Sequence, residues 1–121
     1  MTLFAVALAG AFGATARYVV DGLVQDRVEG AFPWGTWVVN ITGSFALGFL
    51  TGLALDHGLG DTPKAVIGAG FIGAYTTFST FTYETLRLVE EGSRYEAALN
   101  VATSTAIGLL AAGAGLALAA V

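Results

Sequence analysis

The chain has 121 residues, of which 55% are hydrophobic and 12% are charged, and its mean hydropathy is +0.73. This composition excludes an ordinary water-soluble domain and indicates an integral membrane protein. The formal net charge of −4 lies on short connecting segments and gives no reason to expect a nucleic-acid partner, and the absence of cysteine excludes disulfides, thiolate chemistry and sulfur metal sites.

Charged residues gather in three clusters, at 17–29, 56–64 and 84–96. The stretches between them are uncharged and about 20 residues long, which is the length that crosses a bilayer. We therefore predict one domain over residues 1–121, an all-α integral membrane protein with four transmembrane helices. The predicted spans are Leu3–Val20, Gly35–Leu55, Lys64–Thr85 and Ala97–Ala120.

Arg17 lies close to the end of the first span, with Asp21 four residues further on. One interpretation is an ion pair on the helix face, and the other is a vestibule that attracts anions. Basic residues of the connecting segments favour one side of the membrane only slightly, so the orientation stays open. Arg17, Arg27, Arg87 and Arg94 lie on one side and Lys64 on the other.

The second span carries a polar stripe, because its small and polar residues recur at intervals of three and four and so share one helical face. An amide at this depth needs hydrogen-bond partners, and Asn40 could offer two donors to a passing anion. An interhelical hydrogen bond is an equally good interpretation of Asn40. The members of the stripe are Thr36, Asn40, Gly43, Ser44, Gly48 and Thr51.

The third span contains the segment GFIGAYTTFSTF at positions 70–81. Its two glycines lower helix stability, and its hydroxyl side chains offer the backbone competing hydrogen bonds, so we predict a break in this helix. Broken backbone inside a bilayer is tolerated only where protein or a water-filled cavity covers it. The segment is therefore the first place to look for function.

Phe78 and Phe81 are three residues apart and project to one side if the segment after the break is helical. Such pairs usually pack in a core. The alternative is that their electropositive ring edges hold an anion without a full positive charge.

The fourth span repeats the polar pattern with Asn100, Ser104 and Gly108 at intervals of four, which favours a lined pathway.

Glycines at 48, 52, 108, 113 and 115 allow helices to approach closely, and their number indicates an oligomer. Opposite charges three or four apart from Glu84 to Arg94 predict a solvated helical extension. Neither paired carboxylates nor a cluster of catalytic or metal-binding side chains occurs in the spans, so we do not expect an enzyme.

Three segments together resemble the Fluc/CrcB family of small fluoride channels. They are GAFGATARY at 10–18, PWGTWVVNITGSFALG at 33–48 and GFIGAYTTFSTF at 70–81. The resemblance implies an antiparallel, dual-topology dimer with two narrow pores in the cell's inner (plasma) membrane, surrounded by lipid. It also implies passive export of fluoride, which lowers fluoride toxicity in the cytoplasm. The dimer could be a homodimer or a heterodimer with a related subunit.

The resemblance also assigns residues. Asn40 would be the pore-lining amide, Phe78 and Phe81 would coordinate fluoride, and Ser79 or Thr80 would supply hydroxyl donors. Backbone carbonyls of Gly73 and Thr76 would hold a structural sodium ion on the two-fold axis, as a hard cation prefers oxygen ligands. Ser104 would belong to the polar track, and Asn100 takes a position where some members of the family have tyrosine.

Two other functions are compatible with four short spans. A small drug/proton antiporter needs a carboxylate within the membrane, whereas Asp21, Asp56 and Glu84 lie at the ends of their spans. In a non-transporting assembly subunit, Asn40 and the phenylalanines would only pack.

Overall fold

The computed structural model describes all 121 residues and contains helices but no strands. Three of its helices are long and apolar enough to cross a membrane. These are α1 (Thr2–Gln25), α2 (Trp34–Asp56) and α6 (Arg94–Ala119). They correspond to the first, second and fourth predicted spans, so the prediction of an all-α protein with several membrane-spanning helices is confirmed.

The region of the predicted third span, Lys64–Thr85, is a series of shorter elements. These elements are α3 (Asp61–Lys64), the π-helix η1 (Ala65–Ile72), α4 (Gly73–Tyr75) and α5 (Phe78–Glu90). Thr76 and Thr77, between α4 and α5, lie outside the helices. That this series crosses the membrane as one discontinuous helix stays a prediction.

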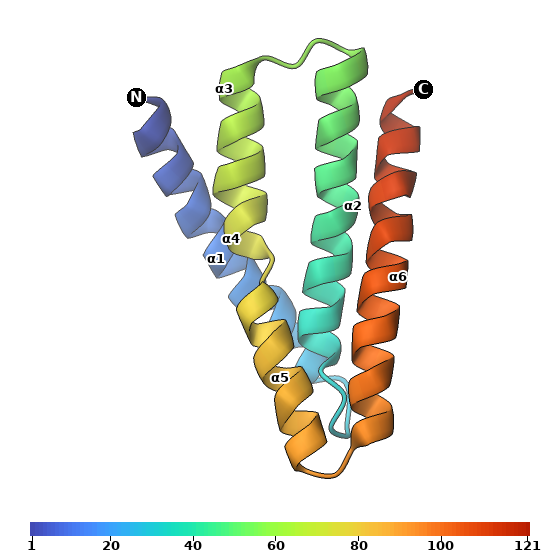
Figure 1. Ribbon diagram of the computed structural model, residues 1–121. Helices are drawn as coiled ribbons and strands as arrows, with labels where there is room; N and C mark the ends of the chain where they lie inside the picture. Colours follow the sequence, from blue (N-terminus) through green and yellow to red (C-terminus); the bar gives the residue numbers. More distant parts are fainter.

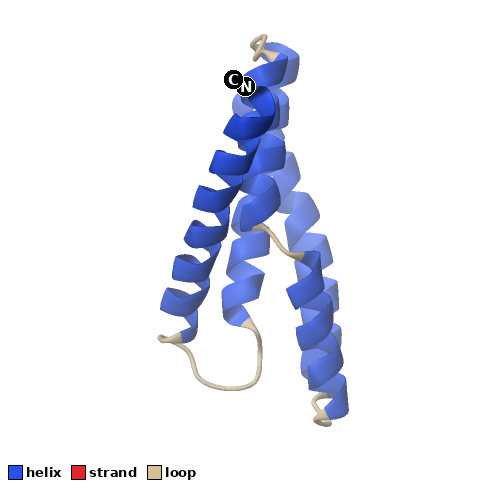
Figure 2. Ribbon diagram, turned by 90° about the vertical axis from the view of Figure 1, so that its left-hand side faces the viewer, coloured by secondary structure: helices blue, strands red, loops and turns tan.

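Figure 1 shows α2 and α6 side by side along their whole length, with α1 crossing the bundle at an angle. The elements α3 and α4 occupy the upper half of the view and α5 the lower half, so residues 76 and 77 lie near mid-height. Both chain termini lie at the same end of the bundle in the two ribbon views (Figures 1 and 2).

Glycines set the distance between α2 and α6. A Cβ atom on Gly48 would overlap the carbonyl of Ala112, and one on Gly115 would overlap the backbone of Phe45. The two backbones are therefore in direct contact, as predicted from the small residues of these spans. Gly113 makes no such contact within the chain, because an added Cβ would have nothing within 4 Å.

The helix α1 packs on η1 in the same way. A Cβ on Gly13 would overlap the carbonyl of Phe71, and one on Gly70 would lie 2.8 Å from the carbonyl oxygen of Val6. The π-helical geometry of Ala65–Ile72 is unusual, because such turns occur mainly as short insertions and often near functional sites.

The ends of α2 and α3 follow the expected chemistry. Pro33 precedes α2 and Pro63 lies within the first turn of α3, where a missing backbone donor is tolerated. His57, directly after α2, has a structural contact. Its Nε2 atom lies 2.6 Å from the carbonyl oxygen of Ala119 and so connects the end of α2 to the end of α6.

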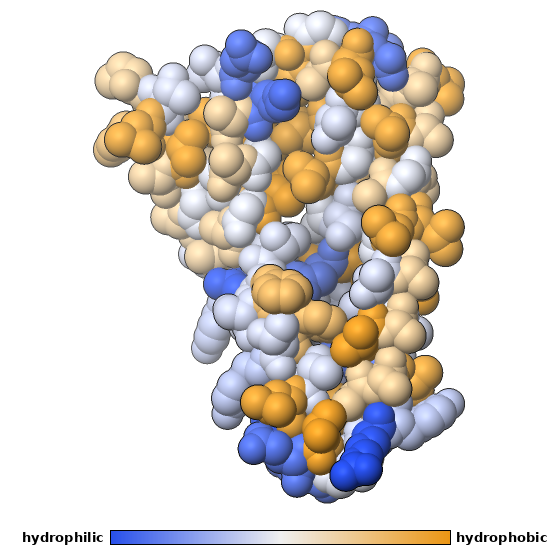
Figure 3. All heavy atoms as spheres, in the orientation of Figure 1, coloured by the Kyte–Doolittle hydropathy of each residue, from blue (hydrophilic) through white to orange (hydrophobic).

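Most apolar side chains of the chain face outward. Only 18 of 121 residues are buried, so the chain presents a large surface for lipid or for another subunit. Figure 3 shows hydrophobic residues over most of the visible face and hydrophilic residues at both ends, with a further hydrophilic group near mid-height. This distribution is typical of a protein that crosses a membrane.

Candidate functional site

Thr76 and Thr77 separate α4 from α5 because their backbones are extended. Their φ and ψ angles are −86° and 161° for Thr76 and −149° and 122° for Thr77. An extended residue cannot continue the helical hydrogen-bond pattern, so peptide groups on either side require other partners.

Asn40 of α2 supplies two of these partners. The Thr77 backbone N–H donates to Asn40 Oδ1 at 2.8 Å, and Asn40 Nδ2 donates to the Thr77 carbonyl oxygen, also at 2.8 Å. The Asn40 amide thus supplies the hydrogen bonds that a neighbouring strand or helical turn would otherwise make with the Thr77 backbone. Since an amide has two N–H donors, one remains for another acceptor, rather than the two that the sequence suggested.

Thr77 also caps the helix that follows it. Its Oγ1 accepts a hydrogen bond from the Thr80 backbone N–H at 3.1 Å, which satisfies one of the unpaired donors at the start of α5. The hydroxyls of Ser79 and Thr80 both lie 3.2 Å from the same oxygen. The two residues predicted as hydroxyl donors therefore gather around Thr77.

Sequence reasoning missed the importance of Thr77, although a signal for it existed. Threonine is a preferred residue directly before a helix, and Thr77 directly precedes the apolar and aromatic start of α5.

A cavity of about 250 Å³ lies beside this junction. The polar stripe of α2, the two extended residues and the first residue of α5 line this cavity. Polar residues and an aromatic ring thus surround one space, and no charged side chain lines it. The lining residues are Asn40, Gly43, Ser44, Leu47, Ile72, Thr76, Thr77 and Phe78.

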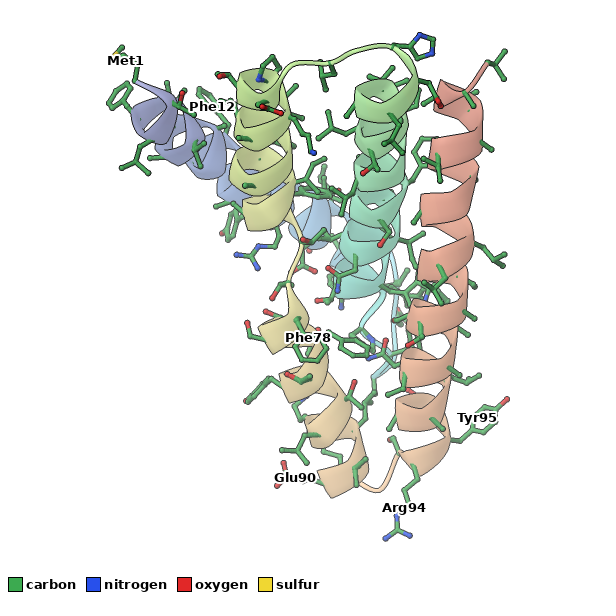
Figure 4. The ribbon with its side chains drawn as sticks, turned by 45° about the horizontal axis from the view of Figure 1, so that its top comes forward. Met1, Phe12, Phe78, Glu90, Arg94 and Tyr95 are labelled. Atoms are coloured by element: carbon green, nitrogen blue, oxygen red, sulfur yellow. The ribbon has the colours of Figure 1, made fainter.

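Phe78 and Phe81 lie on the same side of α5, as predicted from their spacing. Their ring centroids are 5.9 Å apart at an interplanar angle of 42°. Phe78 stands at the start of α5 (Figure 4) and is 77% exposed, so the chain itself does not pack around this ring. Phe81 is partly buried and does not line the cavity.

A second cavity, of about 360 Å³, is also lined by Thr77. Its other lining residues include Arg17 and Asp21 of α1, Thr36 of α2 and Thr80 of α5. Thr77 therefore borders one cavity with charged side chains and one without them. This arrangement is compatible with the vestibule interpretation of Arg17.

The polar residues of α6 lie elsewhere. Asn100 is 1% exposed, donates from Nδ2 to Thr85 Oγ1 at 2.9 Å, and accepts a hydrogen bond from Ser104 Oγ at 3.3 Å. Thr85 in turn donates to the Phe81 carbonyl oxygen at 2.7 Å. Asn100 therefore joins α6 to α5, Ser104 supports it from the same helix, and neither lines the two cavities.

Glu84 differs from the solvated charge that the sequence suggested. It is only partly exposed, and its Oε1 atom is buried without a hydrogen-bond partner. A signal for this was its position three residues after Phe81, which puts it beside that partly buried ring on α5.

The carbonyl groups expected to hold sodium can be tested against these contacts. In a continuous helix the Thr77 N–H would reach the Gly73 carbonyl, but it donates to Asn40 instead. The Thr80 N–H, which would reach the Thr76 carbonyl, donates to Thr77 Oγ1, and no hydrogen bond reaches the Thr76 carbonyl oxygen. Oxygens freed in this way suit a hard cation, so the residues fit the ion.

Comparison with known proteins decides the family. The model of the family described as CrcB-like protein, Camphor Resistance (CrcB), matches residues 4–116. The chain belongs to the CrcB family. Fluoride-specific ion channel FluC 1 of Leifsonia xyli is 48% identical over 121 residues, covering 96% of this chain and 85% of the relative.

Two further CrcB relatives match along most of their length. FluC 1 of Symbiobacterium thermophilum is 48% identical over 120 residues, covering 98% of this chain and 97% of the relative. Fluoride-specific ion channel FluC 2 of Clostridium acetobutylicum is 39% identical, covering 91% of each. The three motifs that first indicated the family all lie within the matched residues.

Proposed function

We propose that the chain is a subunit of a fluoride-specific channel through which fluoride leaves the cell passively across the plasma membrane. The observation that carries the proposal is the uncharged cavity at the α4–α5 junction, which Asn40, Ser44, Thr76 and the Phe78 ring line. The Thr76 hydroxyl already donates to the Ile72 carbonyl oxygen at 3.0 Å, so the donors for an ion are the remaining Asn40 N–H and the Ser44 hydroxyl. The names of the relatives give the same ion.

Fluoride chemistry explains why such a cavity is suitable. The ion is small and strongly hydrated, so its water shell has to be replaced by several close donors. Full positive charges would bind it too tightly for it to leave, whereas amides, hydroxyls and ring edges permit entry and exit. Arg17, in the neighbouring cavity, could meet an anion outside the narrow part, although Asp21 lines the same cavity and offsets part of its charge.

The chain alone does not close this pathway. Phe78 is largely exposed, so a second subunit is needed to surround the ring and the Asn40 cavity. We propose an antiparallel dimer in which α3 to α5 of each copy form a discontinuous third span. A related chain could replace one copy, and the numbering FluC 1 and FluC 2 among relatives supports paired subunits.

Sodium completes this proposal as a structural ion. The carbonyl oxygens of Gly73 and Thr76 from two copies would provide four oxygen ligands on a two-fold axis. The ion would neutralise the carbonyl dipoles where the two junctions meet. A high-resolution structure of the dimer without density between the junctions would remove the sodium from the proposal.

The decisive experiment is ion efflux from liposomes that contain the purified protein. With a potassium ionophore to balance charge, we expect a fluoride gradient to discharge and a chloride gradient to persist. Chloride flux equal to that of fluoride, or no flux from folded dimers, would reject the channel.

The aromatic pair gives a sharper version of the same assay. Phe78→Ile and Phe81→Ile remove the ring edges but keep the side chains apolar, so flux is expected to fall by about tenfold or more while assembly persists. Phe12→Ile is the matched control, because Phe12 is 64% exposed on α1 and lines neither cavity. Equal flux from all three variants would return the rings to a packing role.

A further inference from the structure

A third cavity, the Lys64 cavity, has a volume of about 510 Å³ and lies between α2 and the α3–η1 segment. It shares one lining residue, Leu47, with the cavity that Asn40 lines. The Asn40 cavity in turn shares Thr77 with the cavity of Arg17. The three cavities therefore follow one another in series. Residues that line the Lys64 cavity include Leu47, Leu50, Asp61, Lys64, Gly68 and Ala69.

The series of cavities runs along one face of α2. The α2 residues that line it recur at intervals of three and four from residue 36 to residue 51, which places them on one side of the helix. At a rise of 1.5 Å per residue this stretch is about 22 Å long, which is most of the thickness of a bilayer's hydrocarbon core. These residues include Thr36, Asn40, Ser44, Leu47 and Thr51.

Charged side chains line the series only at its two ends. Arg17 and Asp21 line the cavity at one end, and no charged side chain lines the Asn40 cavity in the middle. Asp61 and Lys64 line the cavity at the other end. Their helix α3 lies opposite to the α1–α2 connection (Figure 1), and hydrophilic residues gather over α3 in Figure 3. Since charged groups at helix ends lie in water, the Lys64 cavity opens toward water at the second membrane surface. The two opposite charges hydrate this opening without strongly attracting anions.

At Leu47 the series becomes apolar. Ser44 lies about one helical turn before it and Thr51 about one turn after it. The Thr51 hydroxyl donates to the Leu47 carbonyl oxygen at 2.8 Å, so its proton is not available to an anion. An ion that moves beyond Ser44 therefore meets the Leu47 side chain without a close donor from α2. Apolar constrictions of this kind limit the movement of ions by excluding water.

Small residues of η1 leave the space on the other side of Leu47. Gly68 and Ala69 line the Lys64 cavity from η1. A Cβ on Gly68 would lie 3.1 Å from Leu50 Cδ2, so part of this space exists because Gly68 has no side chain. Leu47 itself is 48% exposed, so the single chain leaves one side of the series open.

We propose that the fluoride pathway continues from the α4–α5 junction through the Lys64 cavity to water, and that Leu47 forms its narrow apolar part. This inference rests on the proposed channel function and adds the second half of the route. A lipid acyl chain is a poorer occupant of the series, because it would leave the donors of Asn40 and Ser44 unsatisfied. The second subunit of the proposed dimer closes the open side beside Leu47.

The absence of cysteine provides the first test, because one introduced cysteine is then the only thiol of the chain. Ala69→Cys places the thiol in the Lys64 cavity. Ile67→Cys, two residues away on η1 and also exposed in the single chain, places it in a different, apolar cavity. Liposomes that contain either variant are treated on both membrane faces with a charged methanethiosulfonate, which reacts with thiols in water. We expect modification of Ala69→Cys to be about tenfold faster than that of Ile67→Cys. Modification should also reduce the fluoride flux of Ala69→Cys by about tenfold, because the attached group fills the route.

Substitutions of Leu47 test the constriction. Leu47→Asn keeps the size of the side chain and supplies N–H donors where they are missing. The fluoride current per channel in a planar bilayer is expected to rise about fivefold, the effect of one neutral hydrogen bond. Leu55→Asn is the matched control, since Leu55 is 72% exposed at the end of the same helix and lines none of the three cavities. Its current is expected to equal that of the native protein, and a thermal melt of each variant identifies a loss of folding.

The results distinguish this inference from the channel function. A native protein without fluoride current would reject both. Where the native protein conducts, equally slow modification of the two cysteine variants means that lipid or the second subunit fills the Lys64 cavity, which overturns the route. Unchanged flux after modification of Ala69→Cys also overturns it, and Ala65→Cys, in the same cavity, replaces a variant that does not fold. A folded Leu47→Asn variant with native or lower current would contradict the constriction.

Discussion

Two of the neighbours of α2 are held in opposite ways. Toward α6, glycines bring backbone against backbone, and no polar side chain is needed at Gly48 or Gly115. Toward the α4–α5 junction, one amide, that of Asn40, exchanges two hydrogen bonds with the Thr77 backbone. The α2–α6 contact depends on the absence of side-chain atoms at the glycines, whereas the contact with the junction depends on the amide nitrogen and oxygen of Asn40.

This difference has a physical consequence for the two regions. A close-packed backbone contact cannot accept even one added methyl group without moving the helices. A directed polar contact tolerates changes in volume beside an open cavity, but it leaves buried backbone groups unpaired when the donor or acceptor is removed. Substitutions at the α4–α5 junction can therefore change transport without moving α2 relative to α6.

The largest effect is expected from Gly48→Ala, because the new Cβ would overlap the Ala112 carbonyl. We expect a loss of about 3 kcal/mol in stability or failure to assemble, measured by thermal melting in detergent. Gly113→Ala is the control, since its Cβ meets nothing within 4 Å, and helix propensity alone predicts a gain of about 0.5 kcal/mol. Similar melting of the two variants would contradict the packing argument.

The next effect is expected from Asn40→Leu, which leaves the Thr77 N–H and carbonyl without partners. Stability should fall by about 2 kcal/mol, and fluoride flux by a further factor of about ten through loss of the remaining N–H. Thr51→Val is the matched change on α2, because the Thr51 hydroxyl bonds only to Leu47 of its own helix. Normal flux from a stable Asn40→Leu protein would refute both roles of the amide.

Thr77→Val tests the Thr77 hydroxyl, since valine keeps the shape but removes the cap on the Thr80 N–H together with the contacts to the Ser79 and Thr80 hydroxyls. A loss of about 1 kcal/mol is expected, together with faster hydrogen exchange at the start of α5. In Thr82→Val the lost hydroxyl bonds only to carbonyls of its own helix at an exposed position, so little change is expected. Equal exchange rates in the two variants would show that α5 begins without the Thr77 cap.

The smallest effect is expected at His57. His57→Ala removes the hydrogen bond to the Ala119 carbonyl at an exposed end of the bundle, so about 0.5 kcal/mol should be lost. His57→Gln, which retains a side-chain donor, should recover part of it. Thermal melts of the native protein and the two variants measure these differences in stability. A larger loss of stability in His57→Gln than in His57→Ala would contradict the contact.

The long helices could be predicted from the sequence because one property, the length of uncharged stretches, determines them. The glycine contacts between α2 and α6 were partly predictable for a similar reason, as glycine has few other uses inside a span. Gly113 shows the limit: spacing gives the face of a helix but not whether a neighbour lies on that face.

The candidate site was predictable in its members more than in its contacts. Asn40, Phe78 and the hydroxyl residues were identified, since polar groups in a span are conspicuous. The partner of Asn40 is the Thr77 backbone, and the sequence does not indicate which backbone groups lack helical hydrogen bonds. The burial of Asn100 and the partial burial of Glu84 were not predictable for a related reason, because burial depends on how α5 tilts against α6 and not on local spacing.

Both ends of the polypeptide emerge at the same end of the helix bundle. A reporter fused to either end should therefore occupy the same aqueous compartment, and an inverted copy should display its reporters in the other one. Joining two inverted copies into a single polypeptide cannot be achieved with a flexible tether alone. The connecting segment would itself have to traverse the bilayer, and this requirement distinguishes an inverted pair from a pair with shared orientation.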